Sequence, residues 1–293
     1  MIVPAGTQAV VEMSDNSSWD TYFEGSESSF IGVFIKDRTV RLSPFIMGQY
    51  EVTQELYKAV AGTYTNYYNS SPASEETQKL RPAEQMNWYK AVAFCNILTE
   101  IIGIRNSASR IDYAYYTDDK CIVPYLDTTK TDIYYKKDSK GYRLPTEAEW
   151  EFAARGGDAT AEAWQYAFAG VQTASTDKTK FVTDHNTDGN LANYGWYIRN
   201  SESKTHEVGL KPANTLGLYD VSGNVCEWCW DWYGTIAKED VTDPVGPDSP
   251  SYGRVYRGGC CTYFPPTCAV STRYAVAPST PKKEIGFRVC RSL

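Results

Sequence analysis

Residues 254–293 constrain the fold more than any other part of this sequence, because both ends of the stretch alternate apolar and polar side chains. Such alternation, seen at 254–259 and again at 285–290, is typical of half-buried strands. Between them, residues 260–281 have neither a helical nor a strand period, and Arg273 is their only charged residue. We therefore predict a long loop held by a strand at each end. Long ordered loops are more often functional than not, and a merely irregular surface connection is the alternative.

Composition limits the class of protein. Aromatic residues make up 14 % of the 293 residues, with 23 Tyr and 8 Trp, which predicts a large core built on aromatic packing. The formal net charge of −7, without a Lys/Arg cluster, argues against a nucleic-acid partner. No apolar run is long enough to span a membrane, and no signal peptide is recognisable at Met1. No linker rich in Ser, Gly or Pro divides the chain, so we predict a single domain over residues 1–293, with 1–40 as the lead-in and first strands.

The eight cysteines are too few for a disulfide scaffold, and they leave the redox compartment open. Cys226 and Cys229 form a CxxC pair, but no second pair exists, so a zinc site would lack half of its ligands. A redox-active CxxC is the alternative. Because His185 and His206 are the only histidines, a histidine-rich metal site is excluded.

Local patterns predict three helices, at 53–62, 87–102 and 146–155. Their end signals are Thr53 as an N-cap, Gly103 just past the second helix, and a Thr146–Glu149 capping box. Short strands are expected at 30–35, 40–42 and 45–52, within the Tyr-rich stretch 113–135, and at the alternating tryptophans of 228–232.

Three side chains on these helices raise the question of function. Cys95 lies on the apolar stripe of the second helix, so we expect a buried core thiol. Glu147 and Glu151 share one face of the third helix and are candidates for a carboxylate pair. Helix capping and solvation explain both of them more simply.

Six motifs occur in the order typical of one protein family, over roughly residues 40–293. They read FIMGQYEVTQELYKAV, RPAEQMNWYKAVAFCNILTE, GYRLPTEAEWEFAARGG, NTLGLYDVSGNVCEWCWDWY, RVYRGG and IGFRVC. Together they resemble the formylglycine-generating-enzyme (sulfatase-modifying factor) domain family. The resemblance implies an α+β fold, namely the C-type-lectin-like fold in its expanded formylglycine-generating-enzyme form, with little regular secondary structure.

The same resemblance argues against catalysis. The family's enzymes oxidise a substrate cysteine with two cysteines of the final segment, which are separated by four residues and hold copper. Counted from Gly258 and Gly259, Tyr263 stands at the first of these positions and Cys268 at the second. A soft metal of this kind needs thiolate ligands, which Tyr does not supply. Sulfur insertion into histidine derivatives, a second activity of the family, needs a histidine-rich domain that this sequence lacks.

Residues 260–281, called here the 260–281 segment, point to a non-catalytic branch of the family. The segment has no Lys, Glu, Gln, Met or Trp, and its residues are those reached from an Asn codon when the first two bases change and the third stays a pyrimidine. The sequence therefore resembles the variable proteins of diversity-generating retroelements, of the Treponema type, with residues 254–293 as the variable region. This resemblance implies a cell-surface or secreted monomer that binds a macromolecular ligand and is not an enzyme. The apolar segment favours a protein ligand, and a cysteine oxidase or related oxidoreductase with a degenerate site is the alternative.

The predicted ligand-binding residues all lie in the 260–281 segment: Tyr263, Phe264, Pro265, Thr272, Tyr274, Ala275, Val276, Ala277, Ser279 and Thr280. Six of them are expected to be largely exposed on one face: Tyr263, Phe264, Thr272, Tyr274, Val276 and Thr280. Four framework residues are expected in or against the core: Arg257, Ile285, Phe287 and Val289. Replacing Tyr263, Phe264 and Tyr274 together by Asn is then expected to leave the melting temperature almost unchanged.

Two further expectations follow from the resemblance. Asn224 and Glu227 are candidate calcium ligands, because the family can hold calcium there through backbone and side-chain oxygens, and hydrogen bonding is their alternative role. No cofactor for catalysis is expected. The family has Trp where Cys226 stands and Ser-Trp where this chain has Cys260 and Cys261. Either a Cys226–Cys261 disulfide or independent substitution accounts for these changes.

Overall fold

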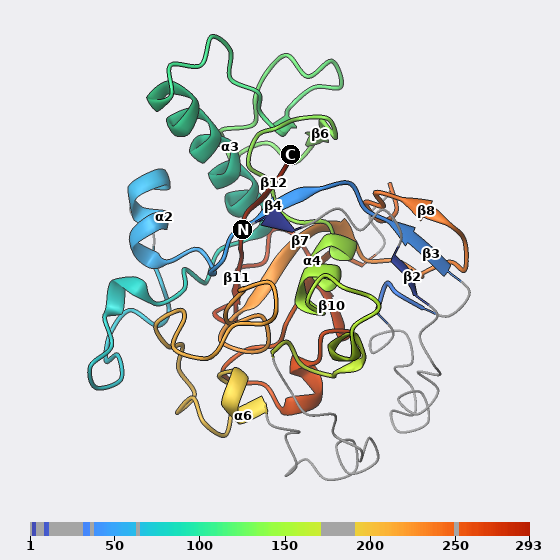
Figure 1. Cartoon of the computed structure of the whole chain (residues 1–293). Helices are drawn as coiled ribbons and strands as arrows, with labels where there is room; N and C mark the ends of the chain where they lie inside the picture. Colours follow the sequence, from blue (N-terminus) through green and yellow to red (C-terminus); the bar gives the residue numbers. More distant parts are fainter. Residues whose placement is uncertain are drawn as a thin grey trace.

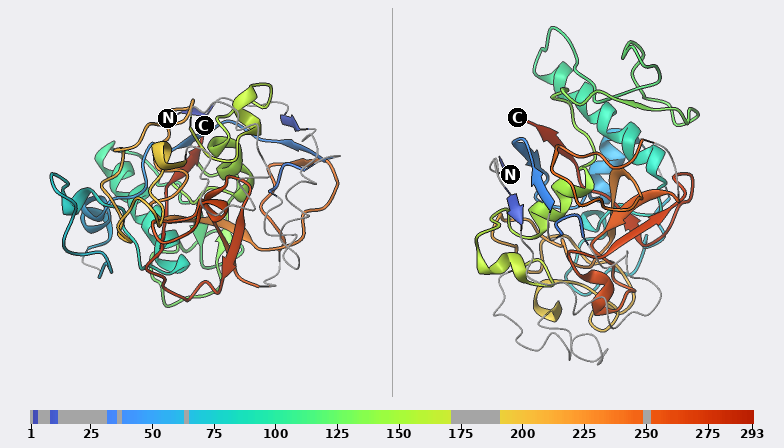
Figure 2. Two further views of the ribbon diagram at one scale, coloured as in Figure 1. Left: turned by 90° about the horizontal axis from the view of Figure 1, so that it is seen from below. Right: turned by 90° about the vertical axis from the view of Figure 1, so that its right-hand side faces the viewer.

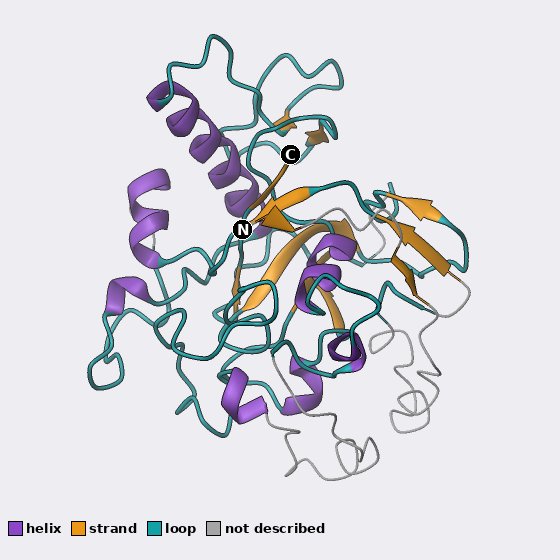
Figure 3. Cartoon of the chain, viewed as in Figure 1, coloured by secondary structure: helices purple, strands orange, loops and turns teal. Residues whose placement is uncertain are grey.

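The computed structural model describes residues 2–3, 9–11, 32–35, 38–62, 65–170, 191–248 and 252–293. Loops and turns make up most of this chain, and short strands and a few helices are set among them (Figure 3). The prediction of an α+β fold with little regular secondary structure is confirmed. The division of the chain into domains stays a prediction.

Three longer helices lie close to their predicted positions, at α2 (Gln54–Ala61), α3 (Trp88–Arg105) and α4 (Glu147–Ala154). The Thr53 side chain caps α2, and the capping box before α4 is formed by Thr146 and Glu149 as expected. The prediction that Gly103 ends the second helix is wrong, because α3 continues through it. A Cβ at Gly103 would lie 2.3 Å from Ile111 Cδ1, so this glycine provides room for packing. Shorter helical turns occur at η2 (Gln78–Leu80), η3 (Glu162–Gln165), α6 (Leu191–Tyr194) and η4 (Pro265–Cys268).

The central sheet has four strands in the order β10-β9-β7-β11. They are β7 (Cys226–Trp232), β9 (Arg254–Arg257), β10 (Arg273–Val276) and β11 (Ile285–Gly286). Strand β9 runs antiparallel to both β7 and β10, whereas β11 is parallel to β7. The prediction of a buried central strand at the alternating tryptophans is confirmed by β7, which has a neighbour on each side.

Three smaller sheets surround this one. They are β1-β4-β12, β2-β3-β8 and β5-β6. Their strands are β1 (Ile2–Val3), β2 (Ala9–Val11), β3 (Arg38–Arg41), β4 (Phe45–Met47), β5 (Tyr115–Tyr116), β6 (Tyr134–Tyr135), β8 (Val241–Thr242) and β12 (Cys290–Ser292). In Figures 1 and 2, α2 and α3 lie on one side of the central sheet and β2-β3-β8 on the other, and both chain ends meet at β1-β4-β12.

Several expected strands are shorter than predicted. Residues 32–35 are irregular, and the rest of the strand predicted at 30–35 lies outside the described residues. The strand predicted at 45–52 ends at Met47, and the one predicted at 285–290 is divided into β11 and the start of β12. Alternation shows which side chains face the core, but it does not show where backbone pairing stops.

Aromatic packing holds the core together, as the composition predicted. Trp88 and Trp230 lie with ring centroids 5.2 Å apart, and the Tyr115 ring stacks on Trp230 at 5.0 Å. The Arg254 guanidinium lies 3.8 Å from the ring centroids of both Trp88 and Trp232. Such cation–π contacts let a buried cation replace part of its lost hydration, which helps to fix β9 against β7.

Candidate ligand-binding surface

The 260–281 segment begins at a glycine pair that ends β9. Gly258 and Gly259 have φ of 92° and 70°, a conformation that other residues adopt only with strain. A Cβ at Gly258 would lie 2.8 Å from the Val221 carbonyl oxygen, so the turn also needs a residue without a side chain. Beyond the turn, the prediction of one long loop is wrong, because the segment contains the helical turn η4 and the strand β10.

The first half of the segment, residues 260–273, is largely inside the protein. Its buried residues are Cys260, Cys261, Pro265, Pro266, Cys268, Ala269, Val270, Thr272 and Arg273. Thr272 has 0 % exposure, and its hydroxyl donates a hydrogen bond of 2.9 Å to the Pro266 carbonyl. The expectation that Thr272 is exposed is therefore wrong, and Pro265, another predicted ligand residue, is buried as well. Their role in ligand binding stays a prediction, but neither offers its side chain to a partner in this conformation.

An ion pair fixes the end of this half to α4. Arg273 Nε and Nη2 donate hydrogen bonds of 2.6 and 2.7 Å to the two carboxylate oxygens of Glu147. Arg257 Nε lies 3.2 Å from the same carboxylate. Burial raises the pKa of Glu147, but Arg273 and Arg257 outweigh this effect, and the pKa lies below its usual value. Arg273 is therefore part of the framework rather than of the displayed surface.

Glu151 forms the second set of buried ion pairs on α4. Its carboxylate accepts hydrogen bonds from Arg257, from Arg155 at 2.9 Å and from the Val33 amide at 2.8 Å. Glu147 and Glu151 are only 2 % and 0 % exposed, so their interpretation as solvated residues is wrong. Solvation was expected because the Arg partners are far away in sequence and no local pattern reveals them.

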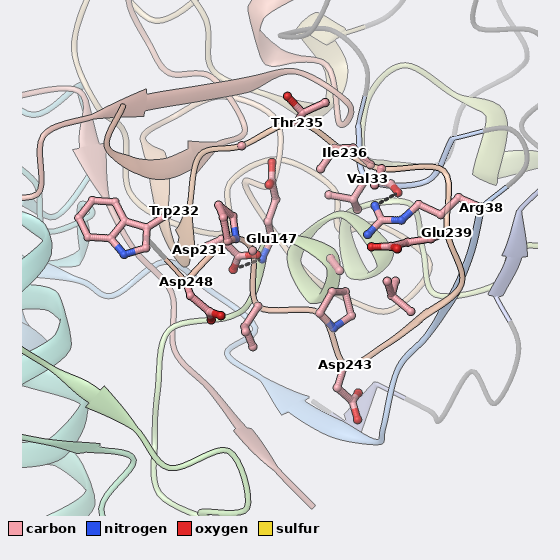
Figure 4. A pocket seen from close by; sticks show the side chains of 18 of the residues that line it. Val33, Arg38, Glu147, Asp231, Trp232, Thr235, Ile236, Glu239, Asp243 and Asp248 are labelled. Carbon is pink, nitrogen blue, oxygen red and sulfur yellow. Dashed lines mark hydrogen bonds between the residues drawn. The ribbon is translucent and has the colours of Figure 1, made fainter. Parts of the chain in front are cut away.

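A pocket of about 470 Å³ lies next to the ion pair of Glu147 and Arg273, between α4 and the chain at 234–248 (Figure 4). Its walls include Arg38, whose guanidinium donates to the Val33 carbonyl at 2.8 Å, and Asp231, whose carboxylate accepts from the Glu147 amide at 2.8 Å. Burial, and next the charge of Glu147, raise the pKa of Asp231 to about 8. Asp231 is consequently protonated at neutral pH.

The second half of the segment, residues 274–281, reaches the surface. Ala277 and Ser279 are exposed, and Tyr274, Ala275, Val276 and Thr280 are half-buried. The expectation that Val276 and Thr280 are largely exposed is therefore wrong. Strand β10 is at the edge of the central sheet, so this half carries its side chains along one rim of the molecule. In Figure 1 β10 is labelled close to β7, and β9 lies between these two strands in the sheet.

Two residues of the first half join this rim. Phe264 is 49 % exposed, whereas Tyr263 is half-buried with its ring centroid 6.1 Å from that of Tyr274. The Tyr274 ring stacks on Tyr256 at 5.4 Å. These two tyrosines are therefore partly core residues, and the expectation that they are largely exposed is wrong. We call Tyr263, Phe264 and residues 274–280 the display surface.

The predicted framework residues are where the sequence put them. Arg257, Ile285 and Phe287 are fully buried, and Val289 is half-buried against the core. Neighbours of the display surface that the sequence did not reveal come from elsewhere in the chain. The Trp88 amide donates a hydrogen bond of 3.0 Å to the Pro278 carbonyl, and the Ile198 amide donates one of 3.1 Å to the Tyr263 carbonyl.

The cysteines do not form an oxidase site of the expected kind. Cys268 is fully buried, and burial raises its pKa, so the group is a thiol at neutral pH. The residue at the first enzyme position is Tyr263. Cys226 and Cys229 belong to two different core clusters, because residues three apart in a strand point to opposite faces. The redox-active CxxC is therefore ruled out by geometry, and the expected burial of Cys95 is confirmed.

The calcium candidates have protein partners. Glu227 accepts two hydrogen bonds of 2.6 Å from Arg288 and one of 2.8 Å from Trp150. Asn224 Oδ1 accepts from the His206 amide at 2.9 Å. No group of three or more His, Cys, Asp or Glu in the described part of the chain is arranged to hold a metal ion. These contacts do not fit a shared cation, and calcium binding stays a prediction that melting with and without a chelator would test.

None of the described helices is long and apolar enough to cross a membrane.

All eight cysteines are free thiols. The Cys226–Cys261 disulfide is thus not formed in this structure. Cys261 Sγ lies 3.8 Å from the Tyr68 hydroxyl.

Comparison with known proteins gives the family. The model of the sulfatase-modifying factor enzyme 1-like domain matches residues 2–293, and the chain belongs to this family. It is 33 % identical over 218 residues to chaperone protein LppX of Paenibacillus barcinonensis, covering 72 % of this chain and 69 % of the relative. It is 29 % identical over 276 residues to the formylglycine-generating enzyme of Thermomonospora curvata, covering 86 % and 83 %. It spans only 21 % of its chlamydial relatives named serine/threonine-protein kinase pkn1.

Among solved structures, Treponema denticola variable protein 1 is similar over 87 % of both chains. Its TM-score is 0.71 and its sequence identity is 38 %. The expected resemblance to the formylglycine-generating-enzyme family and to a Treponema variable protein is therefore confirmed. Relatives named as enzymes and one named as a variable protein both share this fold.

Proposed function

We propose that this protein is a non-catalytic display protein whose 260–281 segment is diversified by a retroelement and binds a macromolecular ligand. The observation that carries the proposal is the similarity to Treponema denticola variable protein 1 over 87 % of both chains. The burial pattern supports it. Phe264, Ala277 and Ser279 are exposed and can change without disturbing the core, and residues 254–259 and 285–289 hold the segment in place.

The proposed ligand is a protein. The display surface presents Phe264, Tyr274, Ala275, Val276 and Ala277, none of which is charged. Aromatic and small polar residues of this kind give contact area and adaptable hydrogen bonds at low cost in rotamer entropy. The proposed location is the cell surface or the secreted fraction.

Genome sequencing tests the diversification. The proposal requires a second copy of the segment next to a reverse-transcriptase gene, with Asn codons at the positions of Phe264, Tyr274, Ala277 and Ser279. The structure adds that the copy should keep an Arg codon at position 273, because Arg273 pairs with Glu147. If the copy is missing, or if Asn codons are spread equally over buried and exposed positions, diversification is wrong.

The binding function has its own test. Wild-type protein and the variant F264N/S279R are immobilised in parallel and exposed to the same surface-protein preparation. A ligand of the display surface should bind the wild type at least tenfold more tightly, with equal melting temperatures for both proteins. Equal binding by both proteins would show that the display surface is not the binding site.

The cysteine oxidase is the second candidate, because several relatives are named formylglycine-generating enzymes. It predicts aldehyde formation on a cysteine-containing sulfatase peptide in the presence of copper and oxygen, and loss of that activity in Cys268→Ser. We expect no aldehyde above the level without protein, because Tyr263 stands where a second thiolate is needed.

A further inference from the structure

Four buried thiols gather where the 260–281 segment leaves the central sheet. Cys226 begins β7, Cys260 and Cys261 follow the glycine pair, and Cys268 ends η4; all four have 0 % exposure. The mechanism of ligand binding uses none of them. Their position between the central strand and the base of the display surface is the feature that needs an explanation.

The backbone brings the two strand ends into direct contact. The Gly223 amide donates to the Gly258 carbonyl at 2.8 Å, and the Cys261 amide donates to the Asn224 carbonyl at 2.9 Å. Next to them, β7 and β9 are in antiparallel register. Extended by one residue, this register places Cys226 opposite Gly258, so Cys260 lies two residues beyond the direct partner of Cys226, just past the glycine turn.

Side-chain directions select one thiol pair. Cys226 and Cys260 belong to the same core cluster. Cys261 instead directs its sulfur toward the Tyr68 hydroxyl, and Cys229 points to the opposite face of β7. The pair left open by the sequence, Cys226 with Cys261, is thus less favourable than Cys226 with Cys260.

We propose that Cys226 and Cys260 form an intramolecular disulfide when the protein folds in an oxidising compartment. The bond would join the start of β7 to the base of the 260–281 segment. In the balanced reaction the two thiols lose two protons and two electrons and form one S–S bond. A small disulfide such as oxidised glutathione accepts them, and its own S–S bond breaks to give two thiols.

The surroundings of Cys260 favour this chemistry. Burial raises the pKa of a thiol, but at Cys260 hydrogen bonds from Cys226 and from two other neighbours outweigh it and hold the pKa below its usual value. In the folded protein Cys260 is therefore the more acidic of the two thiols. Reaction during folding avoids the need for an oxidant to enter the finished core, where both sulfurs are inaccessible.

The disulfide would stabilise the protein chiefly by closing the 226–260 loop in the unfolded chain. It would also fix the base of the display surface while leaving the exposed side chains free to vary. Neither consequence depends on which ligand is bound, so the proposal stands or falls separately from the proposed function.

The experiment refolds the full chain in a mixture of reduced and oxidised glutathione, and in parallel with excess reductant. Free thiols are alkylated, and the protein is digested with trypsin without reduction. Cleavage places Cys226 in the peptide 205–238 and Cys260 in the peptide 258–273. We expect these peptides to be linked after oxidative refolding, and fragmentation should place the bond at Cys226 and Cys260. The oxidised protein should melt about 5 °C or more above the reduced one.

Matched variants separate this bond from its neighbours. Cys229→Ala and Cys261→Ser should keep the linked peptides and the higher melting temperature, whereas Cys226→Ala and Cys260→Ser should lose both. Fragmentation of the wild-type peptides decides the question even if a variant does not fold. Unlinked peptides from correctly refolded wild type, or a bond at Cys261 or Cys229, would overturn the proposal.

Discussion

The two halves of the 260–281 segment have similar compositions and opposite environments. Residues 260–273 pass through the core, where Thr272 and Arg273 are buried against η4 and α4. Residues 274–281 form an edge strand and a surface turn, with Ala277 and Ser279 exposed. Apolar or small polar side chains therefore do not mark a surface by themselves. What distinguishes the halves is whether each side chain has a partner in the framework.

The largest expected effect comes from the buried half. Arg273→Met leaves Glu147 buried with Arg257 as its remaining ion-pair partner, because both of its bonds to Arg273 are lost. Removing one member of a buried ion pair costs about 3–5 kcal/mol. We expect a loss of this size in the free energy of unfolding, measured by denaturant titration.

An exposed arginine provides the control. Arg105 at the end of α3 is exposed, so Arg105→Met should change the free energy of unfolding by less than about 0.5 kcal/mol. Adding Glu147→Leu to Arg273→Met removes the uncompensated charge and should restore part of the stability. A loss below about 1 kcal/mol for Arg273→Met would mean that position 273 is as replaceable as the rim.

The second effect is a pH dependence of stability that comes from Asp231, next to the buried half. Asp231 lines the same pocket as Arg273, and its pKa is raised from 3.8 to about 8. Between these values the folded protein holds a proton that the unfolded chain has lost. Stability from this group is therefore full below about pH 4 and is lost as the pH rises towards about 8.

The matched variant is Asp231→Asn, which has no ionisable carboxyl group but keeps an oxygen that accepts the hydrogen bond from the Glu147 amide. The free energy of unfolding of the variant should fall less steeply than that of the wild type between pH 5 and about 8. The difference between the two slopes removes the contributions of other buried acids such as Glu84 and Asp220. Parallel slopes would show that Asp231 is ionised in the folded protein at these pH values.

The third effect lies at the border of the two halves. Tyr274→Asn removes a ring that stacks on Tyr256 and contacts Tyr263, so we expect a loss of about 1–2 kcal/mol. This replaces the expectation that the triple Asn variant would melt almost like the wild type. An unchanged melting temperature for Tyr274→Asn would place its ring on the displayed side.

Local patterns in the sequence predicted what depends on neighbouring residues. The N-cap Thr53, the capping box of Thr146 and Glu149, and the buried strand β7 all follow from patterns a few residues long. The motifs identified the family, and with it the fold. Arg257, Ile285 and Phe287 were correctly assigned to the core for the same reason.

Long-range pairing was not predictable from those patterns. Arg273 and Glu147 are far apart in the chain, and no spacing rule connects them. Thr272 was expected at the surface because it lies in the segment interpreted as a displayed loop, yet its hydroxyl closes a turn at Pro266. The exposure of individual side chains in the 260–281 segment was therefore predicted only in part: Phe264 is exposed as expected, whereas Thr272 is buried.

The smallest expected effect tests the rim itself. Phe264 is 49 % exposed and Ser279 is exposed, so the double variant F264N/S279N should change the free energy of unfolding by less than about 1 kcal/mol in total. The matched buried change is Thr272→Val, which replaces the hydroxyl by a methyl group of similar size. The Pro266 carbonyl then has lost its hydrogen-bond donor, at a cost of about 1–3 kcal/mol in the free energy of unfolding. Denaturant titration of both variants under one condition gives the comparison directly. If the rim variant is the more damaging of the two, the division of the segment into a buried and a displayed half is wrong, and the surface proposed for binding is instead structural.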